Sequence, residues 1–246
     1  MKKIKRVTEA EVIAEFLKGE FFHPEYDRDR GFFEALVYDP HLTDAVENAL
    51  RRALLYRRRA TMLRELPPDI HWWEVELDAD DLQRITVFPR AQWRSLARGN
   101  FRATHVAELL RDQLNPGNPG DLAAKITSLR SLMSNEGPKS TILLIDIDET
   151  QPATLLEGNH RFVASLLLPP EIMLRRLRLV CGFSPEMDRC CWYKTSVPNL
   201  ARYLKNRIIH MWDREADVTK LLPKTARVQS TDGYAEQANL SSAKQE

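Results

Sequence analysis

The chain has 246 residues, 43% of them hydrophobic, and its 36 Lys and Arg almost balance 35 Asp and Glu, which leaves a formal net charge of +1. A chain of this length can bury one sizeable core, and the balanced charge excludes a global attraction to nucleic acid or anionic membranes. No apolar run approaches the ~18 residues of a membrane span and the charged start does not resemble a signal peptide, so we expect a cytoplasmic protein.

The three cysteines, Cys181, Cys190 and Cys191, lie close together in the sequence. An odd number of cysteines is a poor disulfide framework, so we expect reduced thiols. Adjacent cysteines without a nearby histidine also lack the ligand spacing of a zinc site.

Residues 1–70 are predicted to form a helical N-terminal extension. Thr8 is expected to cap a helix that ends near Gly19, because Glu11 stands three positions later and completes a capping box. A short helix is predicted at 31–37. A long helix begins at Thr43 or Asp44 and reaches about Leu66, before two prolines.

The long predicted helix, 44–66, carries the densest positive charge of the chain: Arg51, Arg52, Arg57, Arg58, Arg59 and Arg64. Leucines between the arginines, and Glu47 four positions before Arg51, favour a packed helix with a solvated charged face. If the arginines have a function, contact with the phosphates of a nucleotide or a nucleic acid is the chemistry that suits them.

Residues 71–212 are predicted to form the α/β domain. Residues 71–77 alternate on a strand period and should be its first strand, and Asp78 should cap a helical turn that leads to 85–88. Helices are predicted at 90–98, 104–114 and 121–135. Two prolines and two glycines in 115–120 predict a loop, either a lid or a variable insertion.

A buried strand is predicted at 142–147 and a second, short strand at 154–156. Gly158 then allows a tight bend before a helix at 159–167. The free N–H groups at this helix start attract an anion, and His160 and Arg161 add donors beside it. The alternative is a plain helix start that Asn159 caps.

Downstream, residues 174–180 alternate arginine and aliphatic side chains and predict a strand with one basic face. Residues 199–211 predict a closing amphipathic helix that packs on the core through Leu200, Tyr203, Leu204, Ile208 and Met211. Residues 213–246 are predicted as a C-terminal tail, which should be disordered from about Lys224.

Gly158, His160 and Arg161, followed by the apolar Phe162, Val163 and Ala164, form a Gly-x-His-Arg motif. Its order resembles the motif of the ParB/sulfiredoxin fold, over roughly residues 72–185. The resemblance implies a small mixed sheet flanked by helices. It also implies that the turn Gly158–Arg161 holds nucleotide phosphates, with Arg161 bridging phosphate oxygens.

This chain differs from two kinds of protein of that fold, and the differences narrow the range of functions to expect. Sulfiredoxin has a cysteine where this chain has Asn159, which removes the nucleophile for sulfinic-acid chemistry. Partition proteins follow the motif with a helix-turn-helix, and the segment after Leu168 shows no convincing pair of DNA-reading helices. A stand-alone small-molecule enzyme is therefore the expected member of the fold.

We accordingly expect an enzyme that binds ATP, ADP or another nucleoside triphosphate with Mg²⁺ at Gly158, Asn159, His160 and Arg161. It would transfer a phosphoryl group to a small polar metabolite, as a kinase does, or hydrolyse the nucleotide. Glu157 and His160 are the candidate catalytic residues, and Glu157 is the candidate Mg²⁺ ligand. The alternative for Glu157 is a simple ion pair with Arg161.

Kinases of this fold also use acidic residues outside the motif, and Glu74 and Glu76 are candidates for that role on the acceptor side. The alternative is a strand with one solvated face. A second function stays open: a non-catalytic, nucleotide-switched or nucleic-acid-associated module that uses the arginine-rich helix 44–66. We expect a nucleotide and a small-molecule substrate as partners, nucleic acid as the less favoured partner, and no membrane; the sequence leaves the oligomeric state open.

Overall fold

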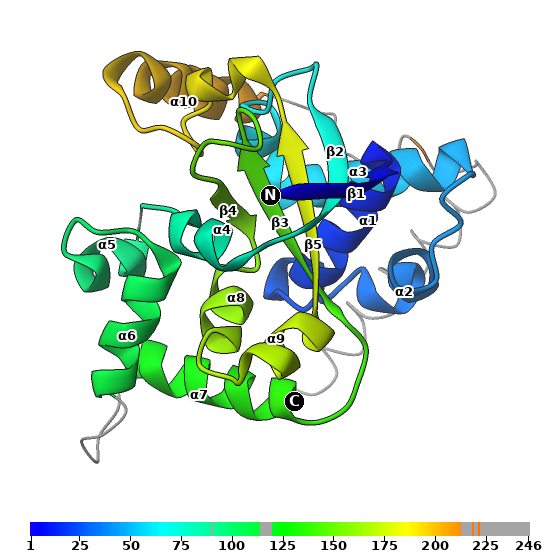
Figure 1. Cartoon of the computed structure of the whole chain (residues 1–246). Helices are drawn as coiled ribbons and strands as arrows, with labels where there is room; N and C mark the ends of the chain where they lie inside the picture. Colours follow the sequence, from blue (N-terminus) through cyan, green and yellow to red (C-terminus); the bar gives the residue numbers. More distant parts are fainter. Residues whose placement is uncertain (90, 114–119, 213–217, 219–220, 222–246) are drawn as a thin grey trace, which may run out of the picture.

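The computed structural model describes residues 1–89, 91–113, 120–212, 218 and 221. Nearly all of the predicted loop at 115–120 and of the predicted tail at 213–246 lies outside the described residues. The described residues form a five-stranded mixed sheet in the order β1-β2-β5-β3-β4 (Figure 1). The strands are β1 (Lys2–Val7), β2 (His71–Glu76), β3 (Ser140–Asp146), β4 (Thr154–Glu157) and β5 (Leu177–Phe183). This confirms the predicted α/β class, a mixed sheet flanked by helices.

Strand β1 was not predicted, because residues 1–70 were expected to be helical. It pairs antiparallel with β2, from Lys2 opposite Glu76 to Val7 opposite Trp72. Of its six residues only Val7 is buried, so the segment lacks the apolar alternation that identifies a half-buried strand. Lysines on an exposed edge strand also discourage pairing with a further chain.

Three α-helices from the N-terminal region lie over one face of the sheet: α1 (Glu9–Glu20), α2 (Arg30–Tyr38) and α3 (Ala45–Leu63), with a 3₁₀ turn at Pro24–Tyr26. Thr8 caps α1, since its hydroxyl accepts a hydrogen bond of 3.2 Å from the Glu11 amide. Asp44 caps α3 through the amides of Val46 and Glu47. The predicted starts of both helices are confirmed.

Six helices lie on the other side of the sheet: α4 (Ala79–Arg84), α5 (Ala91–Ala97), α6 (Ala103–Gln113), α7 (Asp121–Ser134), α8 (Asn159–Ser165) and α9 (Pro170–Arg176). Asp78 caps α4 in a capping box with Asp81, as predicted. The strand predicted at 174–180 begins too early, because α9 continues to Arg176 and β5 starts at Leu177. Pro170 in the first turn suits a helix start, and this favours the helical state of the residues that follow.

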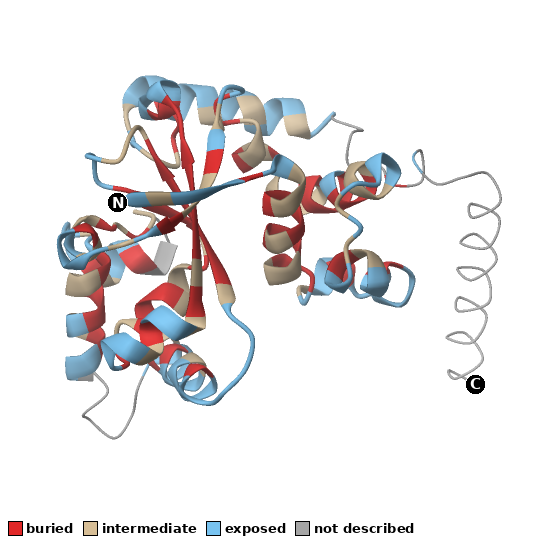
Figure 2. Cartoon of the chain, turned by 45° about the vertical axis from the view of Figure 1, so that its right-hand side comes forward, coloured by how far each residue is buried: buried red, intermediate tan, exposed pale blue. Residues whose placement is uncertain are grey.

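Strand β3 lies between two hydrophobic clusters. Ile142 and Leu144 belong to the cluster under α4–α9, and Leu143 and Ile145 belong to the cluster under α1–α3. Figure 2 shows the buried residues concentrated along the central strands and the inner sides of the helices. Residues 1–70 therefore share a core with the sheet.

Within the described residues the last helix is α10 (Val197–His210), which follows a 3₁₀ turn at Pro185–Arg189. Of the five side chains predicted to pack on the core, only Tyr203 turns inward, where its ring lies edge-on to Trp192. Leu200, Leu204, Ile208 and Met211 are 43%, 52%, 54% and 75% exposed, so they do not pack on the core. The buried residue of the helix is Asn199, whose side-chain amide donates to two backbone oxygens. These side-chain hydrogen bonds fix which face of α10 points inward, and the spacing of apolar residues in the sequence gives no information about them.

Cys181, Cys190 and Cys191 are free thiols, and all three are buried. No helix among the described residues is both long and apolar enough to cross a membrane.

Candidate functional site

The predicted bend at Gly158 is confirmed. Gly158 has φ +86° and ψ +19°, a left-handed conformation, and is the N-cap of α8. A Cβ at this position would lie 2.6 Å from the Cδ1 of Ile142, so the turn also lies against the central strand. Asn159 does not cap the helix: its Oδ1 accepts a hydrogen bond from the Phe88 amide at 3.1 Å. The side chain of Asn159 thus ties the turn to the segment after α4.

Glu157 and Arg161 form an ion pair across this turn. The second amino group of Arg161 donates to the Ser140 hydroxyl at 2.8 Å. Gly19 of α1 lies directly against the pair, because an added Cβ there would be 3.2 Å from both the Arg161 Nη2 and the Glu157 Oε1. Burial raises the pKa of Glu157, and the charge of Arg161 opposes that shift.

His160 is half-buried beside Trp93, with 5.0 Å between the two ring centroids. Burial lowers its pKa to about 4, and the nearby charges of Lys125 and Arg161 act in the same direction. The imidazole is therefore neutral near pH 7. It can accept a proton or a hydrogen bond, but it does not contribute a positive charge toward an anion.

A cleft of about 340 Å³ opens beside the turn, and we call it the Gly158 cleft. It lies between the motif on one side and the end of α1 and the middle of α3 on the other. Its charged lining residues are Glu20, Arg58, Arg59, Lys125, Glu157 and Arg161, and its rim includes Phe22, His23 and Trp93. The cleft thus joins the predicted motif to the N-terminal region.

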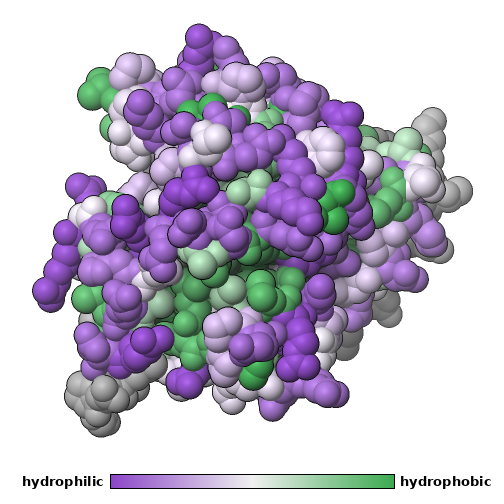
Figure 3. Space-filling view, in the orientation of Figure 1, coloured by the Kyte–Doolittle hydropathy of each residue, from purple (hydrophilic) through white to green (hydrophobic). Residues whose placement is uncertain are grey.

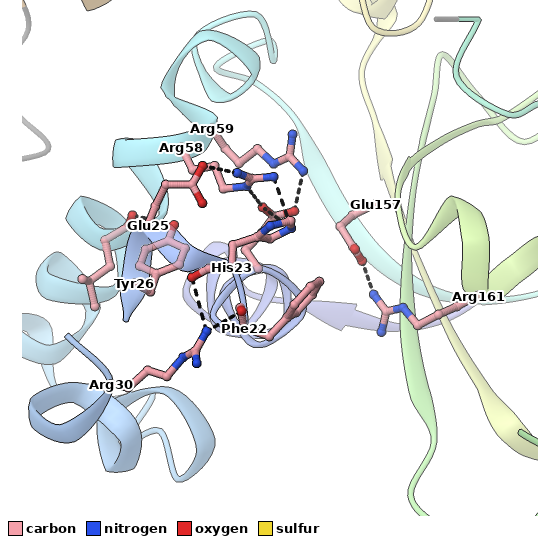
Figure 4. Close-up of polar contacts among 11 residues, drawn as sticks. Phe22, His23, Glu25, Tyr26, Arg30, Arg58, Arg59, Glu157 and Arg161 are labelled. Carbon is pink, nitrogen blue, oxygen red and sulfur yellow. Dashed lines mark hydrogen bonds and ion pairs between the residues drawn. The ribbon is translucent and has the colours of Figure 1, made fainter. Parts of the chain in front are cut away.

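The arginines of α3 reach the Gly158 cleft as part of an ion-pair network (Figure 4). The carboxylate of Glu20, which is almost fully buried, accepts from Arg58 Nε and from Arg59 Nη2, each at 2.5 Å. Arg58 also pairs with Glu25 at 2.5 Å. Figure 4 shows this group and the Glu157–Arg161 pair on opposite sides of the cleft.

Four cationic side chains and two carboxylates line the Gly158 cleft, so the lining carries an excess of positive charge. Lys125, on α7, is exposed and forms no ion pair within the described part of the chain. An arginine already paired to a carboxylate can exchange that partner for a phosphate without changing its protonation. The electrostatics therefore suit a ligand with more than one negative charge.

The rim of the Gly158 cleft offers a flat apolar surface. Phe22 is 62% exposed and stacks on His23 with a centroid distance of 4.4 Å. Burial lowers the pKa of His23, and the charge of Arg58 adds to the shift. A neutral stacked pair of rings next to a cationic cleft is a suitable surface for a planar heterocycle.

The structure does not bring Glu74 and Glu76 to the Gly158 cleft. Both line a separate cleft along β2, β5 and α9, where the apolar side chains below the middle of Figure 3 gather. Glu74 accepts from Arg178 Nε at 2.9 Å, and Glu76 pairs with Lys2 at 3.4 Å. In the sheet, β5 and β3 separate β2 from β4, and neighbouring strands are about 4.8 Å apart.

Glu20 and Lys125 were not predicted as residues of the site, and Arg58 and Arg59, although suited to contact with phosphates, were not placed beside the Gly158 turn. The arginines were noticed as a charged helix face, but their partner, Glu20, lies 38 positions from Arg58 in the sequence. Lys125 had no distinguishing signal. No group of three or more His, Cys, Asp or Glu side chains in the described ranges is placed to hold a metal ion.

The chain matches no protein-family model, no curated protein and no solved structure. The similarity to the ParB/sulfiredoxin motif therefore stays a prediction from residues 158–164.

The substitution Gly158→Ala should destabilise the protein by at least about 2 kcal/mol. Alanine is strained in the left-handed conformation of this residue, and its Cβ would also clash with the side chain of Ile142. Gly31→Ala is the matched control, since a Cβ at Gly31 meets nothing within 4 Å and Gly31 lies in α2. Urea unfolding measures both free energies. Equal effects of the two substitutions would contradict the described turn.

The imidazole of His160 should titrate near pH 4 in NMR spectra of the histidine ring protons, whereas the exposed His41, whose pKa Glu47 raises, titrates above its ordinary value. The unfolded chain binds a proton at His160 near pH 6.5 and the folded protein does not. The free energy of unfolding should therefore fall as the pH drops from about 6.5 to 4, and His160→Gln should flatten this fall. A ring that titrates near pH 6.5 in the folded protein would show that His160 is solvated.

Proposed function

We propose that the Gly158 cleft binds the phosphate groups of a nucleoside di- or triphosphate and that the protein transfers or hydrolyses a phosphoryl group there. The observation that carries this proposal is the convergence of Arg58, Arg59, Lys125 and Arg161 on one cleft beside the Gly158 turn. These cations come from three different helices. Their grouping reflects the tertiary structure and cannot be explained as the solvated face of one helix.

The geometry supports a division of the ligand between the two sides of the cleft. Arg161 and Lys125 flank the turn, so they suit the terminal phosphates. Arg58 and Arg59 lie across the cleft, near the stacked rings of Phe22 and His23. A base on these rings and phosphates near the turn would fill the length of the cleft.

Phosphoryl transfer needs a proton acceptor and charge stabilisation. A new bond forms between the terminal phosphorus and the oxygen of the acceptor hydroxyl or of water, while the bond from that phosphorus to its bridging oxygen breaks. The leaving nucleoside diphosphate or nucleoside monophosphate takes the electron pair of the broken bond. The proton of the attacking hydroxyl goes to Glu157 or His160. The raised pKa of Glu157 makes its carboxylate the stronger proton acceptor, whereas the pKa of about 4 leaves His160 neutral but only weakly basic.

Mg²⁺ fits this proposal as an ion that arrives with the nucleotide. In such sites it takes most of its ligands from phosphates and water and only one or two from protein carboxylates. Glu157 is the carboxylate beside the turn that would hold it, once Arg161 has turned to phosphate, and the proton of the attacking hydroxyl would then go to His160. When bound, Mg²⁺ neutralises charge on the transferring phosphoryl group.

The Gly-x-His-Arg order of residues 158–161 and its resemblance to the ParB/sulfiredoxin fold also support a nucleotide, with ATP or ADP as the first compounds to test and the cytoplasm as the expected compartment. A nucleic-acid module is less well supported. Arg51 is fully buried, and the side chains of Arg57, Arg58 and Arg59 are only 29%, 23% and 31% exposed, so these arginines do not form an open basic face for an extended polyanion.

Isothermal titration calorimetry with ATP and ADP, with and without Mg²⁺, tests the proposal. Wild-type protein should bind at least one of the nucleotides, and Arg161→Ala should weaken binding by about tenfold or more, since charge-assisted hydrogen bonds are lost. Glu157→Gln should leave the affinity for nucleotide unchanged and lower the rate of phosphate release by roughly a hundredfold or more.

Arg189→Ala is the control, because Arg189 is exposed and its ion pair is with Glu186, away from the cleft. It should leave binding and turnover unchanged. Absence of nucleotide binding in the wild type, or equal affinity in Arg161→Ala, would overturn the proposal.

A further inference from the structure

Helix α10 carries an apolar stripe on its outward side, which we define as Val197, Leu200, Leu204, Ile208, Met211 and the following Trp212. Steps of three or four residues place these side chains on one face of the helix. Their exposed fractions range from 43% to 83%. Among the described residues nothing covers this row of large apolar groups, and exposing it to water costs free energy.

The inward side of α10 carries Tyr203, whose ring packs edge-on against Trp192, and two asparagines that fix the helix in this orientation. Asn199 donates to the carbonyl oxygens of Asp188 at 2.9 Å and Lys194 at 2.7 Å. About two helical turns after Asn199, the side-chain amide of Asn206 donates to the buried carboxylate of Glu65. Turning the helix to bury its stripe would remove these hydrogen bonds and leave Glu65 without that donor. The exposed stripe is thus built into the fold.

The charge on helix α10 itself is of one sign. Val197–His210 contain no Asp or Glu and three basic residues, which are Arg202, Lys205 and Arg207, whereas Asp188 precedes the helix and Asp213 follows Trp212 in the sequence. On a helix of 3.6 residues per turn, Arg207 borders one side of the stripe and Lys205 borders the other, while Arg202 lies further round toward the inward side. The whole chain has a net charge of only +1, so this excess is local. A second copy would bring like charges together, and an anionic partner would not.

We propose that α10 docks on an anionic lipid surface, with its axis along the surface and its apolar stripe inserted. An apolar face bordered by Lys and Arg, with an aromatic residue at one end, is the arrangement that interfacial helices use. The basic side chains would reach the lipid phosphates, and Trp212 would lie at the level of the headgroups. The helix lies along the upper edge of the molecule in Figure 1, so a broad surface can approach it without a shaped groove.

A membrane partner was not expected from the sequence, because spanning segments and global charge do not report an apolar stripe that lies along a surface. The inference is also independent of the nucleotide site, since α10 contributes no residue to the Gly158 cleft.

Co-sedimentation of the full chain with vesicles tests the proposal. The protein should bind vesicles of phosphatidylcholine and phosphatidylglycerol in equal parts and should not bind vesicles of phosphatidylcholine alone. The double variant Leu204→Gln, Ile208→Gln should bind at least about tenfold more weakly, because two inserted side chains are lost. Replacing Lys205 and Arg207 by Gln should weaken binding roughly thirtyfold.

Leu132→Gln on α7 is the matched control, because Leu132 is 66% exposed and belongs to a helix at the other end of the molecule (Figure 1). Thermal unfolding of each variant shows whether it is folded. Three results would overturn the proposal: no binding to the anionic vesicles, equal loss in the Leu132→Gln control, or a solution dimer that the Leu204→Gln, Ile208→Gln variant converts to a monomer. The last result would assign the stripe to self-association instead.

Discussion

Burial of strand β3 on both faces is the constraint on which the rest of the structure depends. Its side chains alternate between two hydrophobic clusters, so helices must cover both sides of the sheet. Ile142 occupies the space beside Gly158, and this contact holds the β4–α8 turn against the strand. The N-terminal helices that cover the other face bring Gly19 and the arginines of α3 next to the same turn. The cleft is thus a consequence of the layered core.

The cleft combines a buried carboxylate network with an excess of cations. Glu20 and Glu157 hold Arg58, Arg59 and Arg161 in place before any ligand arrives. Paired arginines lose less side-chain freedom when a phosphate replaces a carboxylate, since they are already ordered. The same pairing lets the site remain folded when it is empty, because no buried charge is left without a partner.

Features with local causes could be predicted from the sequence, and features with distant causes could not. Thr8, Asp44 and Asp78 mark helix starts through their own neighbours, and Gly158 marks the turn through its missing side chain. By contrast, β1 depends on a partner strand about 70 residues away. The Glu20 contacts of α3 depend on how two helices pack, and the outward face of α10 depends on hydrogen bonds to Asp188, Lys194 and Glu65. None of these causes leaves a periodic signal in the segment itself.

The most direct measurement of the central claim is a crystal structure of the protein with ADP or a non-hydrolysable ATP analogue. The account predicts phosphate oxygens within hydrogen-bond distance of Arg161 and Lys125, with the base against Phe22 and the contact between Arg161 and Glu157 loosened. A nucleotide bound elsewhere, or a Gly158 cleft that stays empty with the Glu157–Arg161 pair intact, would contradict it.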